Sequence, residues 1–259
     1  MIPVREAALP PLTRRLIGWE IIVVFAVSLG GSALIAIINL IGSITSRKAL
    51  HQQQALLVGS FAPGRPWLDL ALQLANILLN LAPVALVFYL LAREGEGPSV
   101  MGLDTAHPGQ DAARGAALAA IIGGTGLGLY LAAFHLGVSL NVVPENLPAV
   151  WWRTPVLILD ACQNGVIEEI LVLGYLLRRL DQLGWSPGRA IAASAVLRGS
   201  YHLYQGLGGF VGNAAMGVIF GVLYRRWGRV TPMIIAHSLI DAVAFVGYAA
   251  LHGHVSWLP

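Results

Sequence analysis

Long apolar stretches dominate this chain, and short polar segments separate them. Seven stretches are long enough to cross a hydrocarbon core of about 30 Å, which takes about 20 helical residues. They cover residues 17–43, 67–92, 112–138, 152–180, 187–205, 209–225 and 230–251. Apolar residues follow one another without the alternation that an outer-membrane barrel requires. The pattern therefore predicts an all-α fold, a polytopic bundle of transmembrane helices.

The segment 49–66 decides whether the predicted count is seven or eight spans. It contains ALLVGSFAPG, which is apolar but short and interrupted by glycine and proline. We expect a loop there and seven spans, or eight if this segment also crosses. We expect one integrated membrane domain, in which residues 1–150 form N-terminal transmembrane helices and loops and residues 151–259 form the core that carries the chemistry.

The composition excludes a soluble protein. Of the 259 residues, 56% are hydrophobic and 11% are charged, whereas a soluble domain carries about 25% charged residues. The net charge of +3 does not indicate a nucleic-acid partner, because the 16 Lys and Arg residues are scattered between the apolar stretches. The expected surroundings of the chain are therefore the lipid bilayer, without nucleic acid.

Basic residues at the ends of the predicted spans indicate an orientation, because cytoplasmic loops carry an excess of Lys and Arg. With alternating spans, four basic residues fall on one side and eleven on the other. The larger set is Arg5, Arg14, Arg15, Arg93, Arg114, Arg178, Arg179, Arg189, Arg225, Arg226 and Arg229. This distribution predicts a cytoplasmic N-terminus.

Six ionisable residues lie inside predicted spans, where a central charge costs about 2.5 to 3.5 kcal/mol on insertion scales. They are Glu168 and Glu169 in one span, Arg198 and His202 in the next, and His237 and Asp241 in the last. A rise of about 1.5 Å per residue puts them at similar depth, about 12 to 20 Å from the cytoplasmic arginines. The second and third pairs have i, i+4 spacing, so each pair shares one helix face. We expect all six to surround one polar cavity.

Carboxylates beside imidazoles can activate water, either directly as a general base or by holding a metal ion that does so. The sequence contains neither a GxSxG nor an HExxH motif, so the common serine and soluble zinc hydrolase signatures are absent. Zinc accepts two His and a carboxylate with one site open for water. The expected ligands of zinc or another divalent metal are Glu168, His202, His237 and Asp241. A metal-free mechanism stays open, and so does a non-catalytic transporter, immunity or scaffold protein that uses these charges to bind an ion or fix helix packing.

Three motifs on separate predicted helices carry a resemblance to a known family. They are EEILVLGYLLRRL from Glu168, RGSYH ending at His202, and HSLID from His237 to Asp241. In this order the sequence resembles the CPBP intramembrane endopeptidases, which include CAAX-processing Ras-converting enzymes and bacteriocin-immunity-type proteins. The upstream MGLDTAHPGQD is also similar to a loop that often precedes the family's core.

The resemblance implies a hydrolase of the intramembrane protease or metalloprotease type. By position, Glu168 is the principal base, Glu169 its partner, His202 the second-motif histidine, and His237 with Asp241 the third motif. The implied substrate is a peptide or protein at the membrane, and the implied location is a bacterial plasma membrane. The oligomeric state stays open.

Two positions depart from the family pattern in a way that looks complementary. The family's arginine, expected four residues after Glu169, is Leu173, and the family's phenylalanine four residues before His202 is Arg198. Because Arg198 lies at about the depth of Glu169, we expect it to supply the missing positive charge as an auxiliary partner. The third motif can end in Asn or Asp. An Asn could donate a hydrogen bond to a developing oxyanion. An Asp at 241 can do so only when protonated, and when ionised it could ligate a metal instead.

Overall fold

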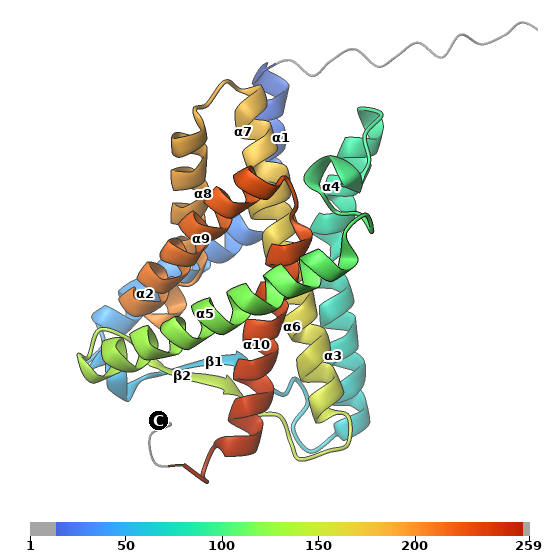
Figure 1. Ribbon diagram of the computed structural model, residues 1–259. Coiled ribbons are helices and arrows are strands. Elements are labelled where there is room, and N and C mark those ends of the chain that lie inside the picture. Colours follow the sequence, from blue (N-terminus) through green and yellow to red (C-terminus); the bar gives the residue numbers. More distant parts are fainter. Residues whose placement is uncertain (1–13, 256–259) are drawn as a thin grey trace, which may run out of the picture.

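The computed structural model describes residues 14–255 and folds every predicted apolar stretch into helix (Figure 1). The α-helices are α1 (Arg14–Ala26), α2 (Leu29–Ile44), α3 (Pro66–Asn80), α4 (Ala82–Arg93), α5 (Pro108–His135), α6 (Arg153–Glu169), α7 (Leu176–Gln182), α8 (Pro187–Tyr201), α9 (Leu207–Trp227) and α10 (Thr231–Leu251). Shorter helical turns are η1 (Leu50–Gln52), η2 (Pro98–Met101), the π-helical η3 (Ile170–Tyr175) and η4 (Leu203–Gln205).

Within residues 14–255, four helical segments are long and apolar enough to cross a membrane by length and composition. They are Pro66–Arg93, Pro108–His135, Leu207–Trp227 and Thr231–Leu251. The pair α1 and α2 makes a fifth if it counts as one bent span. The predicted spans 152–180 and 187–205 fall outside this set. In the first, the α-helical part α6 has 17 residues before the π-helical η3 begins, and in the second α8 has only 15 residues. The chain is polytopic, but the count of seven or eight is not confirmed.

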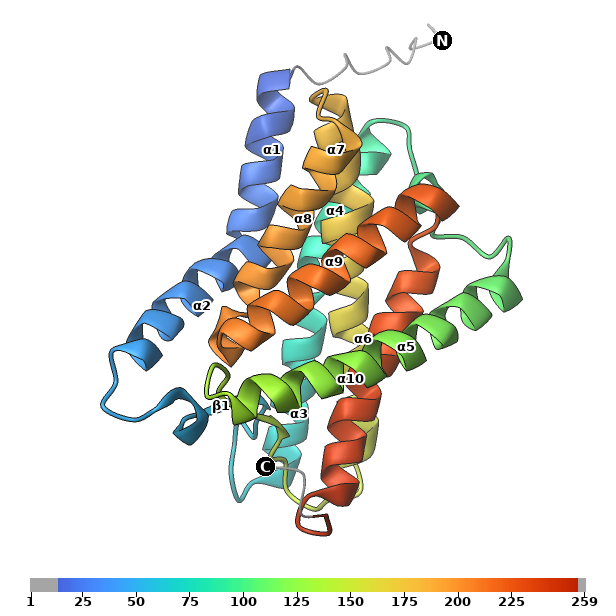
Figure 2. The ribbon, with the colours of Figure 1, turned by 60° about the vertical axis from the view of Figure 1, so that its left-hand side comes forward.

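Two of the predicted spans are interrupted near their middle. The first bends by 54° between α1 and α2, where the Ser28 hydroxyl donates to the Val24 carbonyl at 2.5 Å. Such back-bonding favours a bend in a helix. The predicted span 67–92 is interrupted at Leu81, two residues before Pro83. Pro83 has no N–H to continue the helical hydrogen bonds. Figure 2 shows α2 leaning away from the line of α1 below the bend.

A small parallel sheet is the exception to the predicted all-α fold. Strand β1 (Gln54–Val58) pairs with β2 (Asn141–Glu145), with Gln54 opposite Asn141 and Val58 opposite Glu145. The segment 49–66, predicted as a loop, therefore contributes a strand as well as η1. Each strand has only five residues, and their pairing joins segments far apart in the chain, so local pattern could not indicate it.

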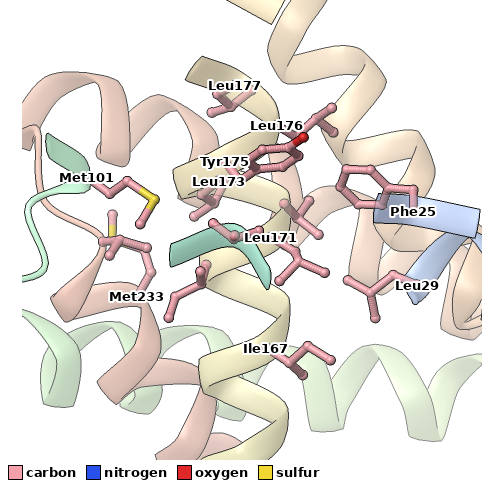
Figure 3. Close-up of a cluster of buried hydrophobic side chains, with 14 of the residues drawn as sticks. Phe25, Leu29, Met101, Ile167, Leu171, Leu173, Tyr175, Leu176, Leu177 and Met233 are labelled. Atoms are coloured by element: carbon pink, nitrogen blue, oxygen red, sulfur yellow. The ribbon is translucent and has the colours of Figure 1, made fainter. Parts of the chain in front are cut away.

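The continuous helix formed by α6, η3 and α7 lies at the centre of the main apolar cluster. Residues 170–173 and 175 are almost fully buried, and helices from both sides of residue 150 pack around them. Figure 3 shows Met101 and Met233 on one side of this helix and Phe25 and Leu29 on the other. The proposed division at residue 150 therefore does not separate two hydrophobic cores.

Many large apolar side chains point outward from the bundle. Leu34 and Ile38 on α2, Leu78 on α3 and Ile121 on α5 are all more than half exposed. Contiguous apolar surface of this kind would be unfavourable in water but suits lipid chains. Together with the apolar helices, it supports an integral membrane protein.

Several of the arginines predicted to be cytoplasmic lie at one end of the bundle. In both views the start of α1, which carries Arg14, and α7, which carries Arg178, lie at the upper end (Figures 1 and 2). The end of α10 lies at the opposite end (Figures 1 and 2). The predicted Arg5 lies outside the described residues.

The segment MGLDTAHPGQD is held against the turn between α9 and α10. The Val230 amide donates to the Met101 carbonyl at 3.0 Å, and the Arg229 guanidinium pairs with the Asp111 carboxylate at 2.7 Å and with Asp104 at 2.9 Å. The hydrogen bond from Arg229 lowers the pKa of Asp104 below its ordinary value. These contacts fix the start of α10, the helix that carries His237.

Helices α6 and α10 cross closely at Gly165, and this contact gives a testable prediction. A Cβ at Gly165 would lie 2.9 Å from the Ser238 backbone nitrogen and 3.0 Å from the Ile234 carbonyl oxygen. Because backbone atoms cannot rotate away, Gly165→Ala should force the helices apart and lower the free energy of unfolding by about 1–3 kcal/mol.

The matched control for this substitution is Gly124→Ala on α5, where an added Cβ would meet nothing within 4 Å. Thermal unfolding in detergent should show a lower midpoint for Gly165→Ala and no loss for Gly124→Ala. Equal midpoints for the parent and Gly165→Ala would mean that α6 and α10 can move apart at Gly165 without loss of stability.

Candidate active site

The paired carboxylates lie where α6 ends and the π-helical η3 begins. Glu168 and Glu169 are the last residues of α6, and η3 follows directly at Ile170. A π-helical turn widens the helix and is frequent at functional sites. Glu169 is fully buried, and the Glu168 side chain is 12% exposed. The two neighbouring carboxylates therefore have different access to the surroundings.

Glu169 is held by a cation and an imidazole from two other helices. Its Oε2 accepts a hydrogen bond from Arg198 Nη2 at 2.7 Å, and its Oε1 lies 2.7 Å from His237 Nδ1. Arg198 on α8 is fully buried, and its ring-face contact with Phe220 brings the guanidinium carbon 5.7 Å from the ring centroid. The structure places Arg198 beside Glu169, the residue that it was predicted to neutralise.

Glu168 faces a different set of groups. Its Oε2 accepts a hydrogen bond from the Tyr201 hydroxyl at 2.7 Å and lies 3.6 Å from Arg198 Nη1. The Nε2 atoms of His202 and His237 each lie 4.0 Å from a Glu168 oxygen. These distances exceed a direct hydrogen bond and suit a bridging water molecule.

The orientation of both imidazoles follows from what their Nδ1 atoms contact. His202 Nδ1 lies 3.0 Å from the Arg198 carbonyl oxygen, which can only accept, so Nδ1 carries the hydrogen. His237 Nδ1 faces a Glu169 carboxylate that also binds Arg198, so it donates as well. In the neutral tautomers this leaves Nε2 of both rings, each 4.0 Å from a Glu168 oxygen, without a hydrogen.

Asp241 completes the cluster from one turn further along α10. Its Oδ2 lies 3.7 Å from His237 Nε2 and accepts a hydrogen bond from Asn164 Nδ2 at 3.2 Å. The structure therefore brings together all six ionisable residues expected at one depth, from α6, α8 with its C-cap, and α10.

A cavity of about 650 Å³ reaches Glu168 from the side of the N-terminal helices. Its walls come from the bend between α1 and α2, the interruption between α3 and α4, and one face of α6. Polar groups line it beside apolar ones, among them Ser28, Asn80, Gln163 and Asn164. The volume is in the range of small-molecule and peptide-segment sites. Glu168 is thus accessible through a mixed polar and apolar cavity.

The predicted metal ligands are spaced more widely than the donors of a tetrahedral zinc site. Donor atoms around a tetrahedral zinc lie about 3.3 Å apart, given bonds of about 2.0–2.2 Å. A Glu168 oxygen lies 4.0 Å from Nε2 of His202 and another lies 4.0 Å from Nε2 of His237. Nε2 of His237 lies 3.7 Å from Oδ2 of Asp241. Among residues 14–255, no group of three or more His, Cys, Asp or Glu is arranged to hold a metal ion. Binding of a metal by these residues stays a prediction.

Two further residues of the cluster were not assigned to it from the sequence, which indicated Tyr201 only as a residue that could line a substrate groove beside His202. Tyr201 binds Glu168, and Asn164 binds Asp241. Their positions carried a usable signal, since Tyr201 directly precedes His202 and Asn164 lies four residues before Glu168 on the same helix face. The other site residues were selected because they are ionisable and lie inside predicted spans. Tyr201 and Asn164 carry no charge, so this criterion did not select them.

The fold and this cluster define a class: polytopic helical membrane proteins with a buried site of carboxylates and histidines. Residues 150–243 match the family model of the type II CAAX prenyl endopeptidase Rce1-like proteins, which confirms the resemblance to the CPBP family. The match includes all six ionisable residues of the cluster and covers less than half of the chain. No curated protein and no solved structure matches this chain. The family match supports an intramembrane protease.

Proposed function

We propose that this protein is an intramembrane endopeptidase that hydrolyses a peptide bond with a water molecule activated by Glu168. The observation that carries the proposal is the position of two imidazole Nε2 atoms, each 4.0 Å from the Glu168 carboxylate beside the cavity. That spacing leaves room for one water molecule that contacts Glu168 and an imidazole together.

The reaction needs only water and the peptide. Oε1 of Glu168 takes a proton from the water, and the hydroxide adds to the carbonyl carbon of the substrate. The C–N bond then breaks, and the proton held by Glu168 passes to the leaving amine nitrogen. His202 and His237 orient the water, while Arg198 and Tyr201 hold the two glutamates in place.

We propose that the substrate enters the 650 Å³ cavity as part of a protein at the membrane. The family name concerns CAAX prenyl endopeptidases, so a lipid-modified C-terminal segment is the first candidate and a transmembrane segment the second. We also propose that the N-terminus is cytoplasmic, which the clustering of arginines at one end supports, and that the protein resides in a bacterial plasma membrane.

The experiment that tests this function uses the purified full chain in proteoliposomes with two quenched fluorescent probes. One probe is a farnesylated peptide ending in a C-a-a-X sequence, and the other is an unprenylated transmembrane peptide. We expect cleavage of at least one probe that depends on Glu168. Cleavage of neither probe would favour the alternative of a non-catalytic membrane protein.

Metal removal gives a separate prediction for the same preparation. Because the donors are too far apart for a metal as placed, treatment with EDTA or 1,10-phenanthroline should leave the cleavage rate within about twofold, and metal analysis should find less than one equivalent of bound zinc. Loss of activity on chelation that zinc restores would contradict the metal-free mechanism and assign Glu168, His202, His237 and Asp241 as candidate ligands.

A further inference from the structure

Peptide hydrolysis requires a hydrogen-bond donor near the carbonyl oxygen, where negative charge develops in the transition state. In relatives whose third motif ends in Asn, that amide can supply the donor. Here the position is Asp241, which has no hydrogen to donate when ionised. If the proposed function holds and Asp241 is ionised, another residue must take this role.

Most donors close to Glu168 are not part of the cavity lining. The Tyr201 hydroxyl hydrogen is used on Glu168 itself. Arg198 uses Nη2 on Glu169, and although its Nε and Nη1 have no hydrogen-bond partner, the guanidinium is fully buried outside the lining. Both imidazoles use Nδ1 on other partners and direct Nε2 toward Glu168. These groups position the base and the water, so the donor must come from elsewhere in the cavity wall.

Asn164 has the required position. It lines the cavity together with Glu168 and lies four residues before it on α6, so the two side chains share one face with Cβ atoms about 5–6 Å apart. Its amide also contacts Asp241, the residue that replaces the family's Asn. The amide of Asn164 is therefore close to the site that the missing amide would occupy.

The orientation of this amide is fixed from both ends. Asn164 Nδ2 donates to Asp241 Oδ2 at 3.2 Å, and Asn164 Oδ1 accepts from Gln163 Nε2 at 3.2 Å. A primary amide has two N–H groups. One of them is used on Asp241, which leaves the second for a ligand in the cavity.

We propose that Asn164 is the oxyanion-binding catalytic residue of this site, and that Asp241 orients its amide. The amide is thus supplied from α6 instead of α10, in the same way that the positive charge is supplied by Arg198 instead of position 173. This inference rests on the proposed function, because an oxyanion forms only if the peptide carbonyl is attacked.

The test compares kcat and KM for the parent, Asn164→Ala and the double variant Asn164→Ala with Asp241→Asn, using a probe that the parent cleaves. Asn164→Ala should lower kcat about 100-fold to 1,000-fold with KM changed less than threefold, as for loss of one oxyanion donor. Adding Asp241→Asn to Asn164→Ala should raise kcat at least tenfold above that of Asn164→Ala, because it returns an amide to the family's position.

The matched control is Asn213→Ala on α9, which removes an amide bonded to the Gly209 carbonyl at 3.0 Å, away from the cavity lining. Its kcat should stay within threefold of the parent. Gel filtration and thermal unfolding in detergent show whether Asn164→Ala folds. If it does not, Asn164→Ser takes its place in the test. Its shorter side chain cannot reach the oxyanion, so the same loss of kcat is expected.

Two results separate this inference from the proposed function. Glu168-dependent cleavage in the parent with an unchanged kcat in Asn164→Ala would overturn the role of Asn164 alone. Absence of any Glu168-dependent cleavage in the parent would overturn both. A large loss in Asn164→Ala that Asp241→Asn does not relieve would contradict the exchange of roles between the two helices.

Discussion

Replacing Glu168 with glutamine should lower the rate of probe cleavage by at least about 1,000-fold, while the protein still inserts and folds. General-base catalysis typically contributes about 100-fold to 10,000-fold, and an amide cannot take the proton from water. The glutamine carbonyl can still accept the hydrogen bond that Tyr201 donates to Glu168 at 2.7 Å. The loss should therefore appear in kcat, with the thermal unfolding midpoint little changed.

A suitable control for this prediction is Glu96→Gln. Glu96 pairs with Arg178 near the end of the bundle that carries the start of α1, away from the cavity that reaches Glu168. Its substitution should leave cleavage within threefold of the parent. If Glu168→Gln retained more than a tenth of the parental rate, Glu168 would not be the base.

The second large effect is expected at Arg198, because its pairing with Glu169 is fully buried on both sides. Arg198→Leu should destabilise the protein by about 3–5 kcal/mol, the range for breaking a buried ion pair by removal of one partner. Glu169 would then have only His237 as a partner, so the imidazole should shift and cleavage should fall as well. Thermal unfolding and cleavage assays measure the two effects.

A double-mutant cycle separates the ion pair from simple packing. Glu169→Gln keeps a side chain that can accept from His237 but removes the charge, so the double variant Glu169→Gln with Arg198→Leu leaves no buried charge unpaired. We expect it to be more stable than Arg198→Leu alone, with a coupling energy above about 1 kcal/mol. Additive effects, or an Arg198→Leu variant as stable and active as the parent, would contradict the pairing.

Several features of the site follow from the sequence because membrane burial makes each charge costly. Each polar pair in the last two motifs has helical spacing, so Arg198 and His202, like His237 and Asp241, had to share a face. The similar depths predicted that the three segments would meet, and the absent arginine at Leu173 predicted the partner of Glu169. The catalytic roles of these residues stay predictions that the variants above test.

Leu173 shows where local pattern stops being informative. An α-helical register puts residue 173 on the face of Glu169, but the intervening segment is the π-helical η3, which changes the turn. Leu173 is fully buried in the apolar cluster that also contains Met101 and Met233. A position that holds arginine in the family is therefore part of the core in this chain.

The sequence by itself determined the helical segments and which charges share a helix face, since both depend on the order of residues within about one turn. The β1–β2 pairing, the cavity beside Glu168 and the placement of Asn164 against Asp241 arise only from the tertiary structure. These features join segments far apart in the chain. The distances between the donor atoms around Glu168 likewise depend on how whole helices pack.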